Sequence, residues 1–234
     1  MKITRNIVII FAGVVSLMAV MAGGLAWSLH SLAPTSRRSV GATATSLEAI
    51  NKQCRDRIGQ DGFGTVTISG VVSLRNQNGR LSTDCRLQLL PGAQLRLIDS
   101  RLETGKLLIS DQASSELPSS ILIDRSKLSG DGFQVRLKAA GSSAIVQDSQ
   151  LNFRLSLGLS LGAGDQDQRA SLVVMGSKLQ SDESASQGII LVSTGRGTFK
   201  NTQFLAPLGD SALLLAPKCQ SNQNRGPITA CGGT

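Results

Sequence analysis

The feature that most constrains the fold of this chain is a short motif that recurs five times. Each copy has an apolar run, then a turn with a hydroxyl residue, then a further apolar position. The hydroxyl residues are Ser100, Ser126, Ser149, Ser177 and Thr202. They are 26, 23, 28 and 25 residues apart. A near-constant period of this size is typical of a solenoid, in which each repeat forms one layer.

Two columns of the repeat are apolar in every copy. Three residues before the hydroxyl stand Leu97, Ile123, Val146, Val174 and Phe199. Two residues after it stand Leu102, Leu128, Leu151, Leu179 and Phe204. Because no copy departs from this pattern, we expect both columns to face one shared core.

A second strand-like run follows each motif, and none has the length or the 3.6-residue period of a helix. These runs are residues 106–110, 133–139, 154–160, 188–194 and 212–217. Alternation predicts that Val135 and Leu137 point inward while Arg136 and Lys138 point outward. The sequence therefore predicts an all-β parallel β-helix of about six coils over residues 61–217, with two or three short strands in each layer.

These repeats resemble the right-handed parallel β-helix, or pectin-lyase-like, superfamily over about residues 65–217. The resemblance implies the fold and carries over no catalytic residue, because the motifs of polygalacturonases and pectate lyases are not visible in the chain. The rival fold is the leucine-rich repeat, which needs a leucine eight residues before its asparagine position. That column holds Gly92, Pro118, Gly141, Arg169 and Thr194, which favours the β-helix.

Residues 1–29 predict an export signal. The stretch 7–29 carries no charge and is long enough to span a membrane as a signal anchor. Residues 24–26, Gly-Leu-Ala, also offer a site where a secretory peptide is cleaved. In both interpretations the domain is exported: it is anchored outside the cytoplasm through residues 7–29, or secreted if the signal is cleaved. Residues 30–44 are expected to form a flexible linker.

Residues 45–60 predict a helix that caps the solenoid. Thr45 is the expected N-cap, and Glu48 three residues later completes a capping box. The expected apolar face consists of Leu47, Ile50, Cys54 and Ile58. Such a helix would cover the open end of the repeat core.

The four cysteines, Cys54, Cys85, Cys219 and Cys231, predict disulfides. The simplest pairing is Cys54–Cys85 at the start of the solenoid and Cys219–Cys231 after its end. The second bond would close a C-terminal cap over residues 218–234. Metal binding is the alternative, but no CxxC pair and no nearby histidine supports it, so we expect no metal and no cofactor.

The hydroxyl column is expected to be structural, with side chains that bond from layer to layer and to turn amides. The only histidine, His30, lies outside the repeats, so the repeat domain has no histidine for acid–base catalysis. Asp99, Asp124 and Asp148 precede the column in successive layers. Since the first and third of these layers are about 10 Å apart, we expect turn-capping carboxylates instead of a catalytic pair.

The candidate binding residues follow the hydroxyl column. The residue after each hydroxyl is Arg101, Lys127, Gln150, Lys178 and Gln203, and Arg125 is a further candidate. The net charge of +8 favours an acidic partner. A ladder of cations suits a linear polyanion, whereas the competing explanation is that exposed strands carry cations to deter aggregation.

The sequence therefore favours a non-catalytic exported β-helix domain that binds or scaffolds at the cell envelope. Its expected partner is anionic polysaccharide or another envelope component, and not nucleic acid, which an exported protein rarely meets. One alternative is a polysaccharide lyase or hydrolase with an unrecognised carboxylate–arginine site. Another is a self-assembling envelope scaffold that resembles bactofilins, although a capped end would oppose end-to-end stacking.

Overall fold

The computed structural model describes residues 46–81, 84–112, 116–162, 169–182, 188–205, 212–216, 218–226 and 228–229. The predicted signal segment 7–29 and the linker 30–44 lie outside these residues. Within the described ranges, no helix has the length and apolar character needed to cross a membrane.

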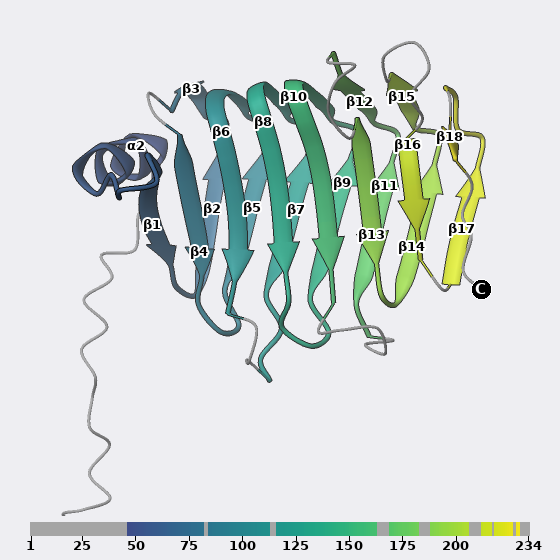
Figure 1. Cartoon of the computed structure of the whole chain (residues 1–234), viewed down its shortest axis with the longest axis horizontal. Coiled ribbons are helices and arrows are strands. Elements are labelled where there is room, and N and C mark those ends of the chain that lie inside the picture. Colours follow the sequence, from purple (N-terminus) through teal and green to yellow (C-terminus); the bar gives the residue numbers. More distant parts are fainter. Residues whose placement is uncertain are drawn as a thin grey trace, which may run out of the picture. The chain divides into compact units, whose positions relative to one another are not determined.

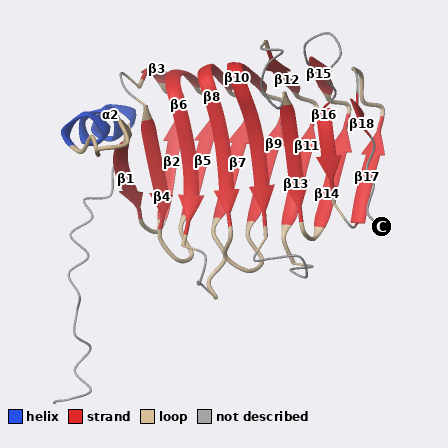
Figure 2. Cartoon of the chain, viewed as in Figure 1, coloured by secondary structure: helices blue, strands red, loops and turns tan. Residues whose placement is uncertain are grey.

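The described chain forms a parallel β-solenoid of about six turns, which confirms the predicted architecture (Figures 1 and 2). The first sheet is ordered β1 (Gly64–Ile68), β4 (Cys85–Leu89), β6 (Arg101–Asp111), β8 (Lys127–Leu137), β10 (Gln150–Leu161), β13 (Ile189–Ser193), β16 (Ala212–Leu215) and β18 (Ile228–Thr229). Three short strands pair beside this path, namely β3 (Asn78–Arg80), β12 (Lys178–Ser181) and β15 (Gln203–Leu205). The second sheet contains β2 (Val71–Arg75), β5 (Gln94–Ile98), β7 (Ser120–Asp124), β9 (Ser143–Gln147), β11 (Ser171–Met175), β14 (Arg196–Lys200) and β17 (Lys218–Asn222).

Alternation of side chains puts the core between the two sheets. Both apolar columns that flank the hydroxyl residues are buried in every copy. Val135 and Leu137 are buried while Arg136 and Lys138 are exposed, as predicted. The core is aliphatic apart from buried phenylalanines, of which Phe133 and Phe153 stack with ring centroids 5.3 Å apart.

The second run of three repeats is not a separate strand, as the sequence had suggested. Strands β6, β8 and β10 are 11, 11 and 12 residues long and include both the end of the motif and the run after it. Their first halves pair with β3 and β12, and their second halves pair with β4 and β13. We call the first halves of β6, β8 and β10, with β3, β12 and β15, the narrow face. The chain can bend between halves because Gly130 packs against the Thr104 carbonyl, where any side chain would clash.

A single residue with positive φ turns the chain from the second sheet to the narrow face. The corner column consists of Asn76, Asp99, Arg125, Asp148, Gly176, Asn201 and Gln223, with φ between 45° and 58°. Glycine, asparagine and aspartate tolerate this left-handed conformation best, and five of the seven residues belong to these types. Segments 112–119, 138–142 and 162–170 make the return from the first sheet to the second.

Helix α2 (Leu47–Asp56) lies at the end of the solenoid next to β1 (Figure 1). Its N-cap is Ser46, whose Oγ accepts a hydrogen bond from Ala49 N at 3.2 Å; the predicted cap, Thr45, was therefore wrong by one residue. Leu47, Ile50 and Cys54 join the core. Ile58 is 52% exposed and does not belong to the apolar face, because the helix ends before it.

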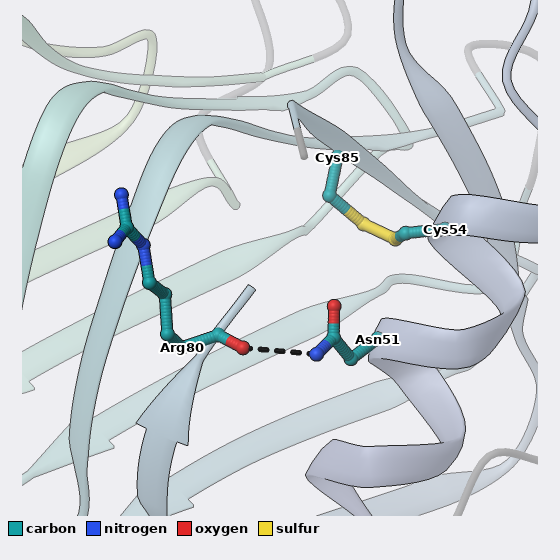
Figure 3. The surroundings of a disulfide bond; sticks show 4 residues. All are labelled: Asn51, Cys54, Arg80 and Cys85. Atoms are coloured by element: carbon teal, nitrogen blue, oxygen red, sulfur yellow. Dashed lines mark hydrogen bonds between the residues drawn. A yellow bond between two sulfur atoms is a disulfide. The ribbon is translucent and has the colours of Figure 1, made fainter. Parts of the chain in front are cut away.

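The predicted disulfide Cys54–Cys85 is confirmed, and it ties α2 to the second strand of the first sheet (Figure 3). Beside it, Asn51 Nδ2 donates to the Arg80 carbonyl at 3.0 Å. Gly64 is in register with Cys85, and a side chain on it would collide with the Cys54 carbonyl. Cys219 is also disulfide-bonded. Its expected partner Cys231 lies outside the described residues, so that pairing stays a prediction.

Gly64→Ala should push helix α2 off the core. We expect the free energy of unfolding to fall by about 1–3 kcal/mol, as for other overpacked sites. Urea denaturation would measure this loss. Gly158→Ala is the matched control, because the nearest atoms to a β-carbon there are 3.9 Å away. Equal stability of the two variants would contradict close packing of α2 against Gly64.

Candidate functional site

The hydroxyl column forms a buried hydrogen-bond ladder beside the corner column. Ser126 N donates to Ser149 Oγ at 3.0 Å, and Ser149 N donates to Ser177 Oγ at 3.1 Å. Each hydroxyl in turn donates to the carbonyl two residues earlier, as Ser126 Oγ does to Asp124 O at 2.8 Å. The same two contacts recur at Ser100, whose Oγ accepts from Gln77 N at 3.1 Å. Because these oxygens satisfy backbone groups of adjacent layers, their geometry is that of structural side chains.

The ladder extends one layer beyond the five copies found in the sequence. Thr202 N donates to Asn224 Oδ1 at 3.0 Å, and Asn224 Nδ2 donates to the Phe199 carbonyl at 2.9 Å. Asn224 therefore replaces the hydroxyl residue in the sixth copy. The spacing from Thr202 is the sequence signal for this layer, but the position holds asparagine and not serine or threonine.

Arg125 links carboxylates of neighbouring layers at the corner column. Its Nε and Nη2 donate to the two oxygens of Asp99 at 2.7 and 3.1 Å, and its Nη1 lies 2.6 Å from Asp124 Oδ2. Asp124 is buried, and its Oδ1 also accepts from Gln147 Nε2 at 2.9 Å. The hydrogen bonds from Arg125 hold the pKa of Asp99 below its ordinary value, and the same contact raises the pKa of Arg125. The charge of Arg125 is thus already compensated within the protein.

The other three candidate cations lie on one line of the narrow face. Strand register aligns Arg101, Lys127, Gln150, Lys178, Gln203 and Arg225, which we call the basic column. The sequence reasoning missed Arg225, because it follows Asn224 and not a hydroxyl residue. Arg125 does not belong to this line, since it occupies the corner column one position away from the ladder.

The cations of the basic column are available to a ligand. In the part of the chain that the structure describes, Arg101, Lys127, Lys178 and Arg225 form no ion pair. The adjacent outward column holds Arg80, Glu103, Ser129, Asn152, Gln180 and Leu205. Only Leu205 in this column is apolar, so the narrow face is a polar surface with uncompensated positive charge.

A groove of about 430 Å³ runs between the corner column and the basic column. One side is lined by Asp148, Gly176, Asn201 and Gln223, and the other by Gln150, Lys178, Gln203 and Arg225. Gly176 carries no side chain in the corner column, and the Asp148 carboxylate of the preceding layer fills the space where its β-carbon would lie. The groove therefore follows the solenoid axis over four layers, about 14 Å from first to last.

Within the described residues, no three carboxylate, histidine or cysteine groups gather closely enough to hold a metal ion. Comparisons of the sequence with family models and with curated proteins, and of the fold with solved structures, found no match.

Removing one rung should destabilise the ladder. Ser149→Ala leaves the buried Ser126 amide without its partner, which is expected to cost about 1–3 kcal/mol of unfolding free energy. Ser149→Thr should retain most of the stability, because Thr202 fills the same position. Urea unfolding compared with Ser160→Ala, an exposed position on β10, tests this. Equal stability of Ser149→Ala and this control would show that the hydrogen bond from Ser126 N to Ser149 Oγ does not stabilise the fold.

The Arg125 cluster should make stability depend on pH. A carboxyl whose pKa is lowered on folding stabilises the fold above its ordinary pKa, and the gain is lost as the pH falls through the lowered value. We therefore expect Arg125→Gln to be less stable than the wild type at neutral pH, and the difference to shrink between about pH 5 and about pH 2. Denaturation at several pH values would measure it.

Arg136→Gln serves as the control for this experiment. Arg136 is exposed and donates only to the Gln134 side chain, at 2.9 Å, so its loss should have a small effect that does not vary with pH. A difference for Arg125→Gln that stays constant down to acid pH would contradict a role for ionised Asp99.

Proposed function

We propose that this chain is a non-catalytic binding domain that holds a linear anionic polysaccharide along its narrow face. The polymer would lie parallel to the solenoid axis, in the groove and over the basic column. The observation that carries the proposal is the alignment of four uncompensated cations, Arg101, Lys127, Lys178 and Arg225, in strand register.

The spacing of the layers supports a polymer over a small ligand. Adjacent parallel strands lie about 4.8 Å apart, so the basic column presents one side chain per layer at a constant interval. A sugar ring in an extended glycan advances by about one such interval. Each ring can therefore meet one side chain of the basic column, and the affinity of each single contact can stay modest.

The polar character of the face suits a sugar ligand. Amide side chains along the groove offer both donors and acceptors to ring hydroxyls, while the cations attract acidic substituents. By contrast, the outer columns of the second sheet include Leu122, Ile145 and Val173, which offer no such partners.

An exported location at the cell envelope belongs to the same proposal. The Cys54–Cys85 bond supports it, since disulfides persist mainly in oxidising compartments, and so does the apolar stretch 7–29 in the sequence. We also propose that the fold is the right-handed, pectin-lyase-like form. The chain runs down the near strands and up the far strands of Figure 1 as it advances away from α2, which supports that winding.

A polysaccharide lyase or hydrolase is the second candidate. The Asp148 carboxylate lines the groove beside Lys178, and it has no hydrogen bond or ion pair with another described residue. A carboxylate and a cation in a sugar-binding groove could serve acid–base chemistry. Two carboxylates are usual for glycoside hydrolysis, and among the described residues that line this groove Asp148 is the only carboxylate.

Binding of the full-length chain, purified in a nonionic detergent, to acidic and neutral polysaccharides tests the proposal. We expect salt-sensitive binding to an acidic glycan and no released sugar. The triple variant Arg101→Gln, Lys127→Gln and Lys178→Gln should bind about threefold to a hundredfold more weakly, because three contacts of about 0.2–1 kcal/mol each add to roughly 0.6–3 kcal/mol.

The matched control removes three cations from other faces, by Arg96→Gln, Arg136→Gln and Lys200→Gln. It changes the net charge equally and should bind within about twofold of the wild type, as expected when only the narrow face contacts the polymer. Equal loss in both triple variants would mean that net charge alone drives binding. Release of sugar that Asp148→Asn abolishes would replace the binding proposal by the enzymatic one.

A further inference from the structure

Beyond Arg101, whose neighbour Lys127 is also a cation, cations and neutral amides alternate along the basic column. From Lys127 onward, the column consists of Lys127, Gln150, Lys178, Gln203 and Arg225. Successive cations are therefore two layers apart, a distance of about 9.6 Å. An alternation that continues over five layers matches a ligand whose repeating unit is two sugars long, not one.

The two glutamines are open to a ligand. Gln150 and Gln203 are exposed, and their side chains form no hydrogen bond with another described residue. An amide offers one acceptor and two donors but no charge. It suits a hydroxyl or acetamido substituent of a neutral sugar, and it leaves a carboxylate without a counter-ion.

The corner column does not repeat this pattern. Asp148 belongs to the layer of Gln150, but its carboxylate occupies the space beside Gly176, in the layer of Lys178. This carboxylate therefore does not distinguish the layer of Gln150 from the layer of Lys178.

The following layers continue the alternation. Asn201 and Gln203 face the groove as two neutral amides, and Gln223 and Arg225 then pair an amide with a cation. Anionic positions at Lys178 and Arg225 are thus separated by one neutral position.

Building on the function proposed above, we infer that the ligand is a linear acidic glycan with a disaccharide repeat, in which a charged uronate alternates with a neutral sugar. Uronate carboxylates lie at Lys127, Lys178 and Arg225. The neutral sugars lie at Gln150 and Gln203.

The test compares two glycans on the full-length protein in a nonionic detergent. Hyaluronan oligosaccharides carry one carboxylate for every two sugars, whereas oligogalacturonates of equal ring number carry one on each sugar. We expect the wild type to bind the hyaluronan oligosaccharide at least tenfold more tightly, despite its lower charge. Simple charge attraction gives the reverse order.

A double variant tests whether the affinity for each glycan depends on the alternation of cations and amides. Gln150→Lys with Gln203→Lys places a cation in every layer and should raise affinity for the oligogalacturonate at least tenfold more than affinity for hyaluronan. The matched control, Gln88→Lys with Gln220→Lys, adds the same charge on other faces and should leave the ratio of the two affinities unchanged.

The outcomes separate this inference from the proposed function. If the wild type binds oligogalacturonate as tightly as hyaluronan or more tightly, and loss of the basic column still weakens binding, the binding function stands and the alternation is overturned. If the double variant shifts both affinities by the same factor as its control, the alternation is likewise overturned. If neither glycan binds, the function and the inference both fall.

Discussion

The hydrogen bond from a backbone amide to the hydroxyl of the next layer is the interaction on which the architecture depends. Four such bonds join successive turns from Gln77 to Ser177, beside corner residues held at positive φ, and Asn224 takes the place of the hydroxyl for the amide of Thr202. Buried backbone donors need partners, and at this corner the strand ladder is interrupted. The hydroxyl supplies the missing partner and thereby holds the register of the strands on both sides. The straight columns on the outer surface follow from that register.

The N-terminal end of the solenoid faces a separate problem, because an uncovered layer would expose the apolar core and unpaired strand edges. Helix α2 covers part of this end with Leu47 and Ile50, and the Cys54–Cys85 bond passes beside Gly64 to the second layer. A small residue in β1 is therefore a condition for the helix to pack. The same cap argues against end-to-end assembly through this surface.

Sequence reasoning predicted the solenoid, the core columns, the first disulfide and the stacking of Arg101, Lys127 and Lys178, because each depends on periodicity or on counting. It did not predict the positive-φ corner, since Arg125 is an unusual residue for that conformation and concealed the column between Asp99 and Asp148. The ion pairs of Arg125 were also hidden, because contacts between layers depend on side-chain reach as well as register. Asn224 and Arg225 were not predicted, because an asparagine amide replaces the hydroxyl in the sixth copy. Merging of two strands into β6, β8 and β10 depended on local bends that periodicity does not report.

The repeats keep their columns straight although their lengths differ. Between the first four rungs the variation falls in the return segments 112–119, 138–142 and 162–170 and in one extra residue of β10. Two residues, the corner residue and the hydroxyl residue, join the second sheet to the narrow face in each of these repeats. Length changes in the return segments therefore leave the basic column and the corner column in place. A lineage of such chains could therefore gain and lose loops freely, while one inserted residue at the corner would turn every later side chain of that strand to the opposite face.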